Sequence, residues 1–285
     1  MDILEDSAYY LESYAAFVSQ HNKFNNLLEL TESVFVEDVV KQLNTEETNI
    51  RMLGIGSSSG RIEIPFIKQL LNRFPNIENT VVEPSADAIV AYQSSIKGKW
   101  NNVKFSWFNG TFQQYREQLE SAGNDQKFHH INMVDSIYYV DNVEDDILFM
   151  YDKLEKGGIM LIVVQSDQCV MYKLKQQYPS LSPNITQLCS TSITDICKTN
   201  QIPFHLHHQE SYGDITGLFS LDGLTRNEKL LLDFWTEMKD FKKQVPESLY
   251  KEVITFIKSP KCSKEIEGKL MVNTDNDMIL IKKQD

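Results

Sequence analysis

The chain has 285 residues, of which 41% are hydrophobic and 24% are charged, with a formal net charge of −12. Such a composition is typical of a soluble globular protein with a sizeable core. The acidic balance argues against nucleic acid and anionic membranes as partners, because both are polyanions. The N-terminus lacks signal-peptide features, and no apolar run approaches the ~18 residues of a membrane span. We therefore expect a cytoplasmic monomer, and the four cysteines, without any C-x-x-C pair, favour free thiols.

Strand-like and helix-like segments alternate from residue 50 onward. Strands are expected at 51–56, 80–83, 103–108, 129–134, 159–164, 203–210 and 278–282. Helices are expected at 62–73, 85–96, 111–120 and 143–156, with Ser85 capping the second and Gly157-Gly158 ending the last. This alternation predicts an α/β fold with mostly parallel strands and helices on both faces of the sheet.

Two regions lie outside the alternation. Residues 5–43 have the pattern of two amphipathic helices before the first strand, and residues 212–270 have a largely helical pattern without flanking linkers. We therefore expect one unit over residues 1–285. It would consist of N-terminal helices at 1–48, a core at 49–211, an inserted, mostly helical lobe at 212–270 and a terminal strand at 271–285.

The segment MLGIGSSSGRIEI, which begins at Met52, has the pattern of a strand, a tight turn and the start of a helix. Gly54, Gly56 and Gly60 give the spacing G-x-G-x-x-x-G. In a doubly wound sheet, ligands bind where this turn lies, and Gly56 would leave room for one against the backbone. A purely structural turn explains the glycines equally well. The spacing differs from the dinucleotide fingerprint and lacks the Lys-Ser/Thr of a P-loop, which disfavours a pyrophosphate or a nucleoside triphosphate.

Glu83 stands at the tip of the second expected strand, in the segment VVEPSAD. An acid at this place in a βαβ unit can accept hydrogen bonds from two ribose hydroxyls. A solvated loop glutamate is the alternative. Together with the glycine turn, Glu83 predicts a cofactor that contains a nucleoside.

The blocks IGSSSG, VVEPSAD, VKFSW and YYV occur in this order, and with them the chain resembles the class I S-adenosylmethionine-dependent methyltransferases. Within this class it is similar to the histamine N-methyltransferases over nearly its whole length. The resemblance implies a Rossmann-like seven-stranded methyltransferase sheet, an inserted substrate-binding lobe and an N-terminal segment that closes the active site. It also implies S-adenosylmethionine as cofactor, S-adenosylhomocysteine as product and a small amine as acceptor. The cofactor contacts that it implies are Gly56, Glu83, Ala88, Phe112 and Val134, and the glycine turn adds Gly60 to the predicted cofactor site.

The segment after the fourth expected strand, MVDSIYYV, is the expected floor of the acceptor site. Asp135 would lie beside the cofactor, where a carboxylate can select an amine and take its proton, so we assign it a catalytic role. Alternatively, Asp135 caps a helix and the following tyrosines are half-buried core residues. With the resemblance added, the predicted acceptor contacts are Tyr10, Tyr14, Lys23, Asp135, Tyr138, Tyr139, Phe234 and Asn273.

The expected acceptor site departs from the family in several places. Lys23 stands where the family carries a substrate-binding glutamate, Asp135 replaces a glutamine, and Thr274 competes with Asn273 for the position of a substrate asparagine. Two alternatives to an amine methyltransferase therefore stay open, namely a methyltransferase for a carboxylated small molecule and a binding protein without turnover. His205 and His207 would share one face of a strand, but no third ligand is near in sequence, so we expect no metal.

Overall fold

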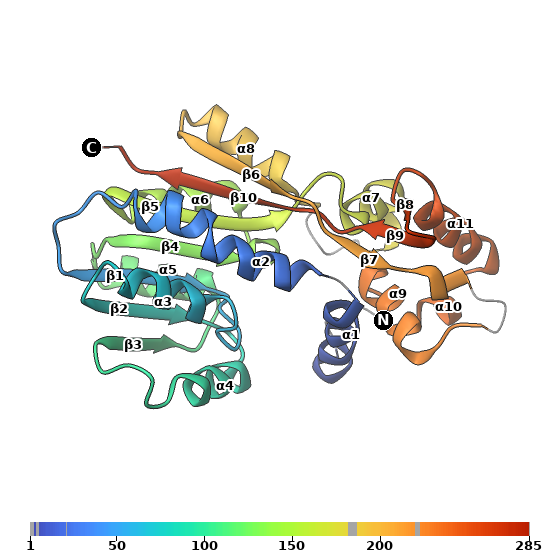
Figure 1. Ribbon diagram of the computed structural model, residues 1–285, viewed down its shortest axis with the longest axis horizontal. Coiled ribbons are helices and arrows are strands. Elements are labelled where there is room, and N and C mark those ends of the chain that lie inside the picture. Colours follow the sequence, from blue (N-terminus) through green and yellow to red (C-terminus); the bar gives the residue numbers. More distant parts are fainter. Residues whose placement is uncertain (1–2, 4–5, 21, 182–186, 220–222, 285) are drawn as a thin grey trace. The chain divides into compact units, whose positions relative to one another are not determined.

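The computed structural model describes residues 3, 6–20, 22–181, 187–219 and 223–284 (Figure 1). The chain divides into two compact units. The core unit comprises Leu27–Val164, Ser192–His207 and Met278–Asp285, and the second unit comprises Met1–Asn26, Gln165–Thr191 and His208–Asp277. The elements, in chain order, are α1 (Ser7–Gln20), α2 (Lys23–Glu32), the π-helix η2 (Phe35–Val40), β1 (Asn49–Ile55), α3 (Glu63–Leu71), β2 (Asn76–Val82), α4 (Ala86–Ile96), β3 (Val103–Phe108), α5 (Phe112–Ser121), β4 (Phe128–Val134), the 3₁₀-helix η3 (Ile137–Tyr139), α6 (Val143–Asp152), β5 (Leu154–Gln165), α7 (Val170–Gln177), η4 (Pro179–Leu181), α8 (Ser190–Thr199), β6 (Phe204–Gln209), β7 (Tyr212–Asp214), η5 (Thr216–Phe219), α9 (Arg226–Thr236), α10 (Phe241–Gln244), α11 (Glu247–Lys258), β8 (Ser263–Ile266), β9 (Lys269–Asn273) and β10 (Asn276–Lys282).

A seven-stranded sheet with the order β3-β2-β1-β4-β5-β10-β6 forms the centre of the fold within the described residues. The neighbours β1 and β2, β2 and β3, β1 and β4, and β4 and β5 pair in parallel. Strand β10 runs opposite to β5 in Figure 1, so the sheet is mixed. Figure 1 also shows α3 and η2 on one face, with α5 and α6 on the other. The predicted α/β class and the seven-stranded sheet are confirmed.

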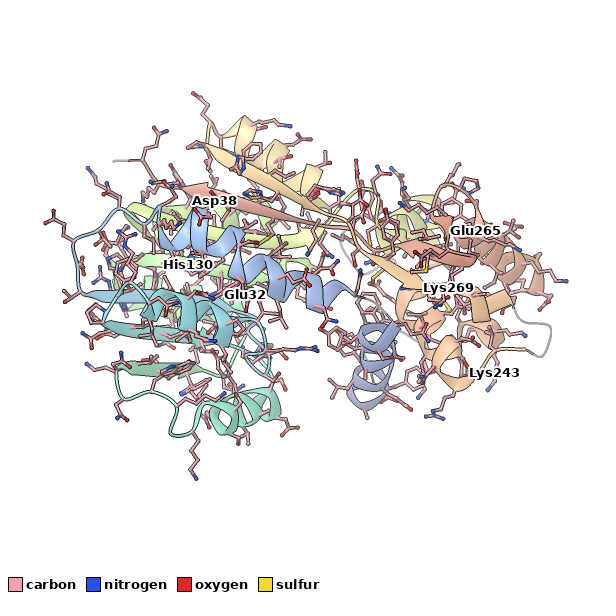
Figure 2. All side chains as sticks on the ribbon, viewed as in Figure 1. Glu32, Asp38, His130, Lys243, Glu265 and Lys269 are labelled. Atoms are coloured by element: carbon pink, nitrogen blue, oxygen red, sulfur yellow. The ribbon has the colours of Figure 1, made fainter. Side chains whose placement is uncertain are left out.

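The middle of this sheet is buried on both faces. Every residue of β4 except the last is buried, as expected for a parallel strand covered by helices on both sides. His130 lies at its centre, is fully buried and is labelled in Figure 2. Its Nδ1 lies 2.9 Å from the carbonyl oxygen of Ile159, and its ring meets the edges of Phe35 and Phe66. Burial lowers the pKa of His130 to about 4, so the imidazole is neutral at physiological pH.

Short polar side chains begin the helices that follow the strands. Ser85 caps α4, as predicted, with its hydroxyl accepting a hydrogen bond from the Ala88 N–H at 3.2 Å. Thr111 and Gln114 form a capping box at the start of α5. Each such cap stabilises its helix by roughly 1 kcal/mol. The caps therefore help to fix where the helices begin beside the carboxyl ends of the strands.

The expected helix at 143–156 is wrong in its last part, because α6 ends at Asp152 and β5 begins at Leu154. Pairing with β4 moves from Phe128–Leu154 to His130–Ile159, so the segment that contains Gly157-Gly158 forms a bulge in the strand. Gly157 has φ of +72° there. The two glycines thus accommodate an irregular strand rather than a helix end, since bulges bend and twist a strand locally.

The second unit combines helices α1, α7, α9, α10 and α11 with an antiparallel three-stranded sheet of order β7-β9-β8. The helical expectation for 212–270 therefore missed three strands, each of only three to five residues. Residues 212–270 share this unit with 1–26 and 165–191. The Tyr9 hydroxyl donates to the buried carboxylate of Asp233 at 2.5 Å, which ties α1 to α9.

None of the helices in the described ranges combines the length and the apolar character that crossing a membrane requires.

Candidate functional site

The register of the sheet brings three sequence-predicted positions together. Ile55, the last residue of β1, pairs with Val82 of β2 on one side and with Met133 of β4 on the other. The next residues along these strands are Gly56, Glu83 and Val134. They lie where the strand order reverses between β1 and β4, the point at which open α/β sheets bind ligands. The sheet thus places predicted cofactor contacts from three strands at one edge.

The glycine turn between β1 and α3 has the close contacts that its sequence indicated. Gly56 has φ of +67°, and a Cβ atom there would collide with the Cβ of Ser136. Gly60 lies against the ring of Tyr92 so closely that a Cβ would overlap the ring. Both positions require glycine for packing within the protein. The glycines therefore have the structural reason that the sequence left open, since Ser136 and Tyr92 occupy the space that their side chains would need.

Glu83 is held against the turn. Its Oε2 accepts a hydrogen bond from the Ser58 N–H at 2.8 Å, and its Oε1 accepts one from the Ser85 N–H at 2.9 Å. The side chain is 7% exposed, so it is not the solvated loop glutamate of the alternative interpretation. A carboxylate oxygen has two lone pairs, so each oxygen of Glu83 can accept one further hydrogen bond. Two adjacent hydroxyls, as on a ribose, match this pair of acceptors.

The two helices beside this edge carry the other predicted cofactor positions. Ala88 is half-buried in the first turn of α4, next to its Ser85 cap. Phe112 begins α5, is 6% exposed and packs edge-on against Phe149, with ring centroids 6.0 Å apart. Val134 is half-buried at the end of β4. Contacts from these three residues to a cofactor stay predictions.

Asp135 follows β4 directly and lies beside the glycine turn. Its φ is +52°, a left-handed conformation that aspartate tolerates better than most residues, and its N–H donates to the Val163 carbonyl at 2.9 Å. The Ser136 hydroxyl donates to the Ile55 carbonyl at 2.7 Å. These bonds fasten the start of the loop after β4 to the ends of β1 and β5. The alternative interpretation, in which Asp135 caps a helix, is wrong for the next α-helix, α6, because Asn142 is the residue that caps it.

Tyr138 and Tyr139 form the short helix η3 that follows. Their ring centroids are 6.4 Å apart at 87°, and Tyr139 is 56% exposed, whereas Tyr138 is half-buried. An exposed tyrosine beside the predicted site is not a core residue.

Other predicted acceptor contacts belong to the second unit, where they form an aromatic cluster. Tyr10 and Tyr14 on α1 stack at 6.2 Å, and each lies within 6.0 Å of the ring of Phe234 on α9. Phe17 completes the cluster, 4.8 Å from Phe234. The cluster contributes to the core of this unit, in which Phe17 and Phe234 are buried while Tyr10 and Tyr14 are half-buried. The side chain of Lys23 lies outside the described residues.

Asn273 is placed in a polar network of the second unit. Its Nδ2 donates to Asp275 Oδ2 at 2.5 Å, and the Asp275 N–H donates back to Asn273 Oδ1 at 3.0 Å. Asp275 and Asp277 are both buried and both face His208, at 3.5 and 2.7 Å. Burial lowers the pKa of His208, but the hydrogen bond and charge of Asp277 and the charge of Asp275 outweigh it, so this pKa lies above its ordinary value. The sequence reasoning did not include these two aspartates.

His205 and His207 do share one face of β6, with ring centroids 4.4 Å apart. His207 Nε2 lies 2.7 Å from Asp38 Oδ2 on η2, and Asp38 is labelled in Figure 2. Within the described ranges, no three metal-binding side chains gather at one place. His205, Asp38 and Lys282 line a hollow of about 220 Å³, which is smaller than the few hundred Å³ usual for ligand pockets.

Comparisons with known proteins define the class. A family model described as a methyltransferase domain matches residues 27–201. The structure of the YcgJ protein from Bacillus subtilis shares the fold, with a TM-score of 0.55 at 16% identity over 88% of this chain and 98% of that one. The chain belongs to the S-adenosylmethionine-dependent methyltransferases.

Its relatives include histamine N-methyltransferases. The A and B forms from Xenopus laevis are each 30% identical to this chain over 98% of its length and 97% of theirs. The histamine N-methyltransferase of Mus musculus is 27% identical over 98% of this chain and 97% of its own. The predicted resemblance is confirmed, and it extends over both units.

Proposed function

We propose that this protein transfers the methyl group of S-adenosylmethionine to a nitrogen atom of a small amine, namely histamine or a related imidazole or biogenic amine. The observation that carries the proposal is the position of Asp135, which follows the switch-point strand β4 and lies beside the glycine turn. Relatives that are histamine N-methyltransferases and match almost the full chain support the acceptor class.

The residues at the sheet edge fit the cofactor. Glu83 retains one acceptor position on each carboxylate oxygen for the two ribose hydroxyls, and the glycine turn with Gly56 and Gly60 lies directly beside it, held by the bond from the Ser58 N–H. Val134 offers an aliphatic surface to the adenine, and Ala88 and Phe112 flank the same edge. The buried position of Glu83 strengthens its hydrogen bonds, because water competes less for the carboxylate.

When bound, the cofactor would supply a methyl group on a positively charged sulfur, so that a nitrogen–carbon bond forms as the carbon–sulfur bond breaks, the neutral thioether leaves and the nitrogen gives up a proton. Because the methyl group is already activated, the protein's main task is to position the reactants. Asp135 would bind the amine by a charge-assisted hydrogen bond and receive its proton. The exposed face of Tyr139 suits a cationic group. Tyr10, Tyr14, Lys23, Tyr138, Phe234 and Asn273 remain proposed acceptor contacts on the strength of the resemblance.

A carboxylate at position 135 favours an acceptor with a positive charge, whereas the amide that the resemblance places there would accept neutral and charged amines more equally. We therefore propose that the preferred acceptor carries a protonated or protonatable nitrogen in addition to its reacting nitrogen. Histamine has both an imidazole and a primary amine and meets this requirement.

The test measures transfer of a labelled methyl group from S-adenosylmethionine to a panel of amines that includes histamine, other biogenic amines and carboxylated imidazoles. Binding of S-adenosylhomocysteine is measured in parallel by calorimetry. We expect transfer to at least one uncarboxylated amine and inhibition by S-adenosylhomocysteine. Binding without transfer to any acceptor would identify a protein without turnover, and transfer to carboxylated acceptors alone would exclude the proposed acceptor class.

A further inference from the structure

A carboxylate is buried directly behind the glycine turn. Glu63 is the first residue of α3, yet it is only 2% exposed. Its Oε2 accepts a hydrogen bond from the Ser57 hydroxyl at 2.5 Å. Its Oε1 accepts bonds from Asn79 Nδ2 at 2.5 Å and from the Tyr92 hydroxyl at 3.0 Å. These three donors are neutral side chains from the turn, β2 and α4.

The glycine at position 54 belongs to the same arrangement. A Cβ atom on Gly54 would collide with Glu63 Oε2 and would lie 2.5 Å from Ser57 Oγ. Glu63 therefore occupies the space that a side chain on the strand would need. Asn132, which pairs with Gly54 across the sheet, is a further hydrogen-bond partner of Glu63. One carboxylate thus joins the turn, both strands beside β1, and α4.

Burying this carboxylate is costly. Burial raises the pKa of the Glu63 carboxyl above its ordinary value, and hydrogen bonds from Ser57, Asn79, Tyr92 and Asn132 oppose the rise. A buried carboxylate without a cation loses much of its solvation, which hydrogen bonds restore only in part. An apolar residue would continue the buried stripe of Phe66, Ile67 and Leu70 on the same helix face at lower cost. A role beyond packing explains why a polar group stands here.

We propose that Glu63 is a positioning residue for the cofactor, acting through Ser57 on the backbone of the turn. The Ser57 hydroxyl bonds to Glu63, and the next residue, Ser58, donates its N–H to Glu83. Glu63 therefore holds the turn and the ribose-binding carboxylate in one geometry before the cofactor arrives, which lowers the ordering cost of binding. This inference rests on the proposed location of the cofactor at the turn.

The test is a double-mutant cycle on the affinity for S-adenosylhomocysteine, measured by calorimetry. The variants are Ser57→Ala, Glu63→Gln and the double variant, with Tyr92→Phe as a matched control that removes a different donor from the same carboxylate. We expect Ser57→Ala and Glu63→Gln each to weaken binding about fivefold or more, and the double variant to be no weaker than Glu63→Gln, because residues that act as one unit are not additive. Tyr92→Phe should lower the stability to denaturant but leave the affinity within about twofold, since it leaves the bond between Glu63 and the turn in place.

If the wild-type protein binds S-adenosylhomocysteine, two results would overturn the inference. The first is unchanged affinity in both Ser57→Ala and a folded Glu63→Gln variant, which would make Glu63 a purely structural residue. The second is additive losses in the double variant. If Glu63→Gln does not fold, the affinity of Ser57→Ala is compared with that of Tyr92→Phe instead. Ser57 is only half-buried, so we expect the Ser57→Ala variant to fold. Failure of the wild-type protein to bind S-adenosylhomocysteine would refute the proposed cofactor site and this inference together.

Discussion

Replacing Glu83 with alanine should greatly weaken cofactor binding. The carboxylate has one acceptor position left on each oxygen after its bonds to the Ser58 and Ser85 N–H groups. A hydrogen bond to a charged group is worth about 1.5–3 kcal/mol, so loss of even one ribose hydroxyl contact costs about a factor of ten. Loss of both should lower the affinity on the order of a hundredfold.

Calorimetric titration with S-adenosylhomocysteine measures this change directly. Glu78→Ala is the matched control, because Glu78 lies on the same strand, is half-buried and forms a surface ion pair with Lys104 at 3.6 Å. It should bind like the wild-type protein. Circular dichroism and urea denaturation establish that both variants fold. A folded Glu83→Ala variant that binds within threefold of the wild-type affinity would show that the ribose is not held at Glu83.

Three further predictions concern the reaction and the stability of each unit. Asp135→Asn should slow methyl transfer to the best amine on the order of a hundredfold, as expected for a lost proton acceptor, with little change in cofactor affinity; full activity in a rate assay would rule out the proposed role. His130 should make unfolding easier in acid. Its pKa of about 4 in the folded protein lies below the ordinary value of 6.5. Its stabilising contribution is therefore present above pH 6.5 and is lost as the pH falls from 6.5 toward 4. From these values His130 by itself should lower the free energy of unfolding by about 2 kcal/mol between pH 7 and pH 5. His130→Gln should remove this contribution in urea titrations and the exposed-site control His205→Gln should retain it, while the contribution of His129, whose pKa burial also lowers, stays in both variants. Tyr9→Phe leaves the buried Asp233 one donor short and should cost the second unit about 1–2 kcal/mol by urea denaturation, whereas an unchanged midpoint would contradict a structural role for this bond.

Local patterns in the sequence were enough for the parts of the site that lie close together along the chain. The strand, turn and helix around Gly56 and the acid after the second strand follow from short-range rules, since glycine spacing and apolar runs report the conformation of a few neighbouring residues. All seven strands of the sheet were predicted in this way. The family resemblance then supplied the identity of the cofactor, which no periodicity can give.

Local patterns failed where distant strands decide the conformation. Gly157-Gly158 have the sequence of a helix end, but pairing of β5 with β4 makes them part of a strand bulge. The strands β7, β8 and β9 are too short to show a period of two, and they form because they pair with one another. For β5 with β4 and for β7 with β9, hydrogen bonds between segments remote in sequence outweigh local preference, whereas β8 and β9 form a hairpin joined by Glu267 and Gly268.

The sequence by itself determined the class of fold, the glycine turn and the acid that faces the expected ribose. Only the tertiary structure decided that Ser136 packs on Gly56, which brings Asp135 beside the turn, and that Glu63 supports the turn from behind. A signal for Glu63 was present, since residues 63, 66, 67 and 70 form one buried stripe of a helix and the first of them is charged. The pattern could show that this carboxylate is buried, but its partners come from the turn, from β2, from β4 and from α4, and a contact between segments far apart in the chain exists only once the sheet has assembled.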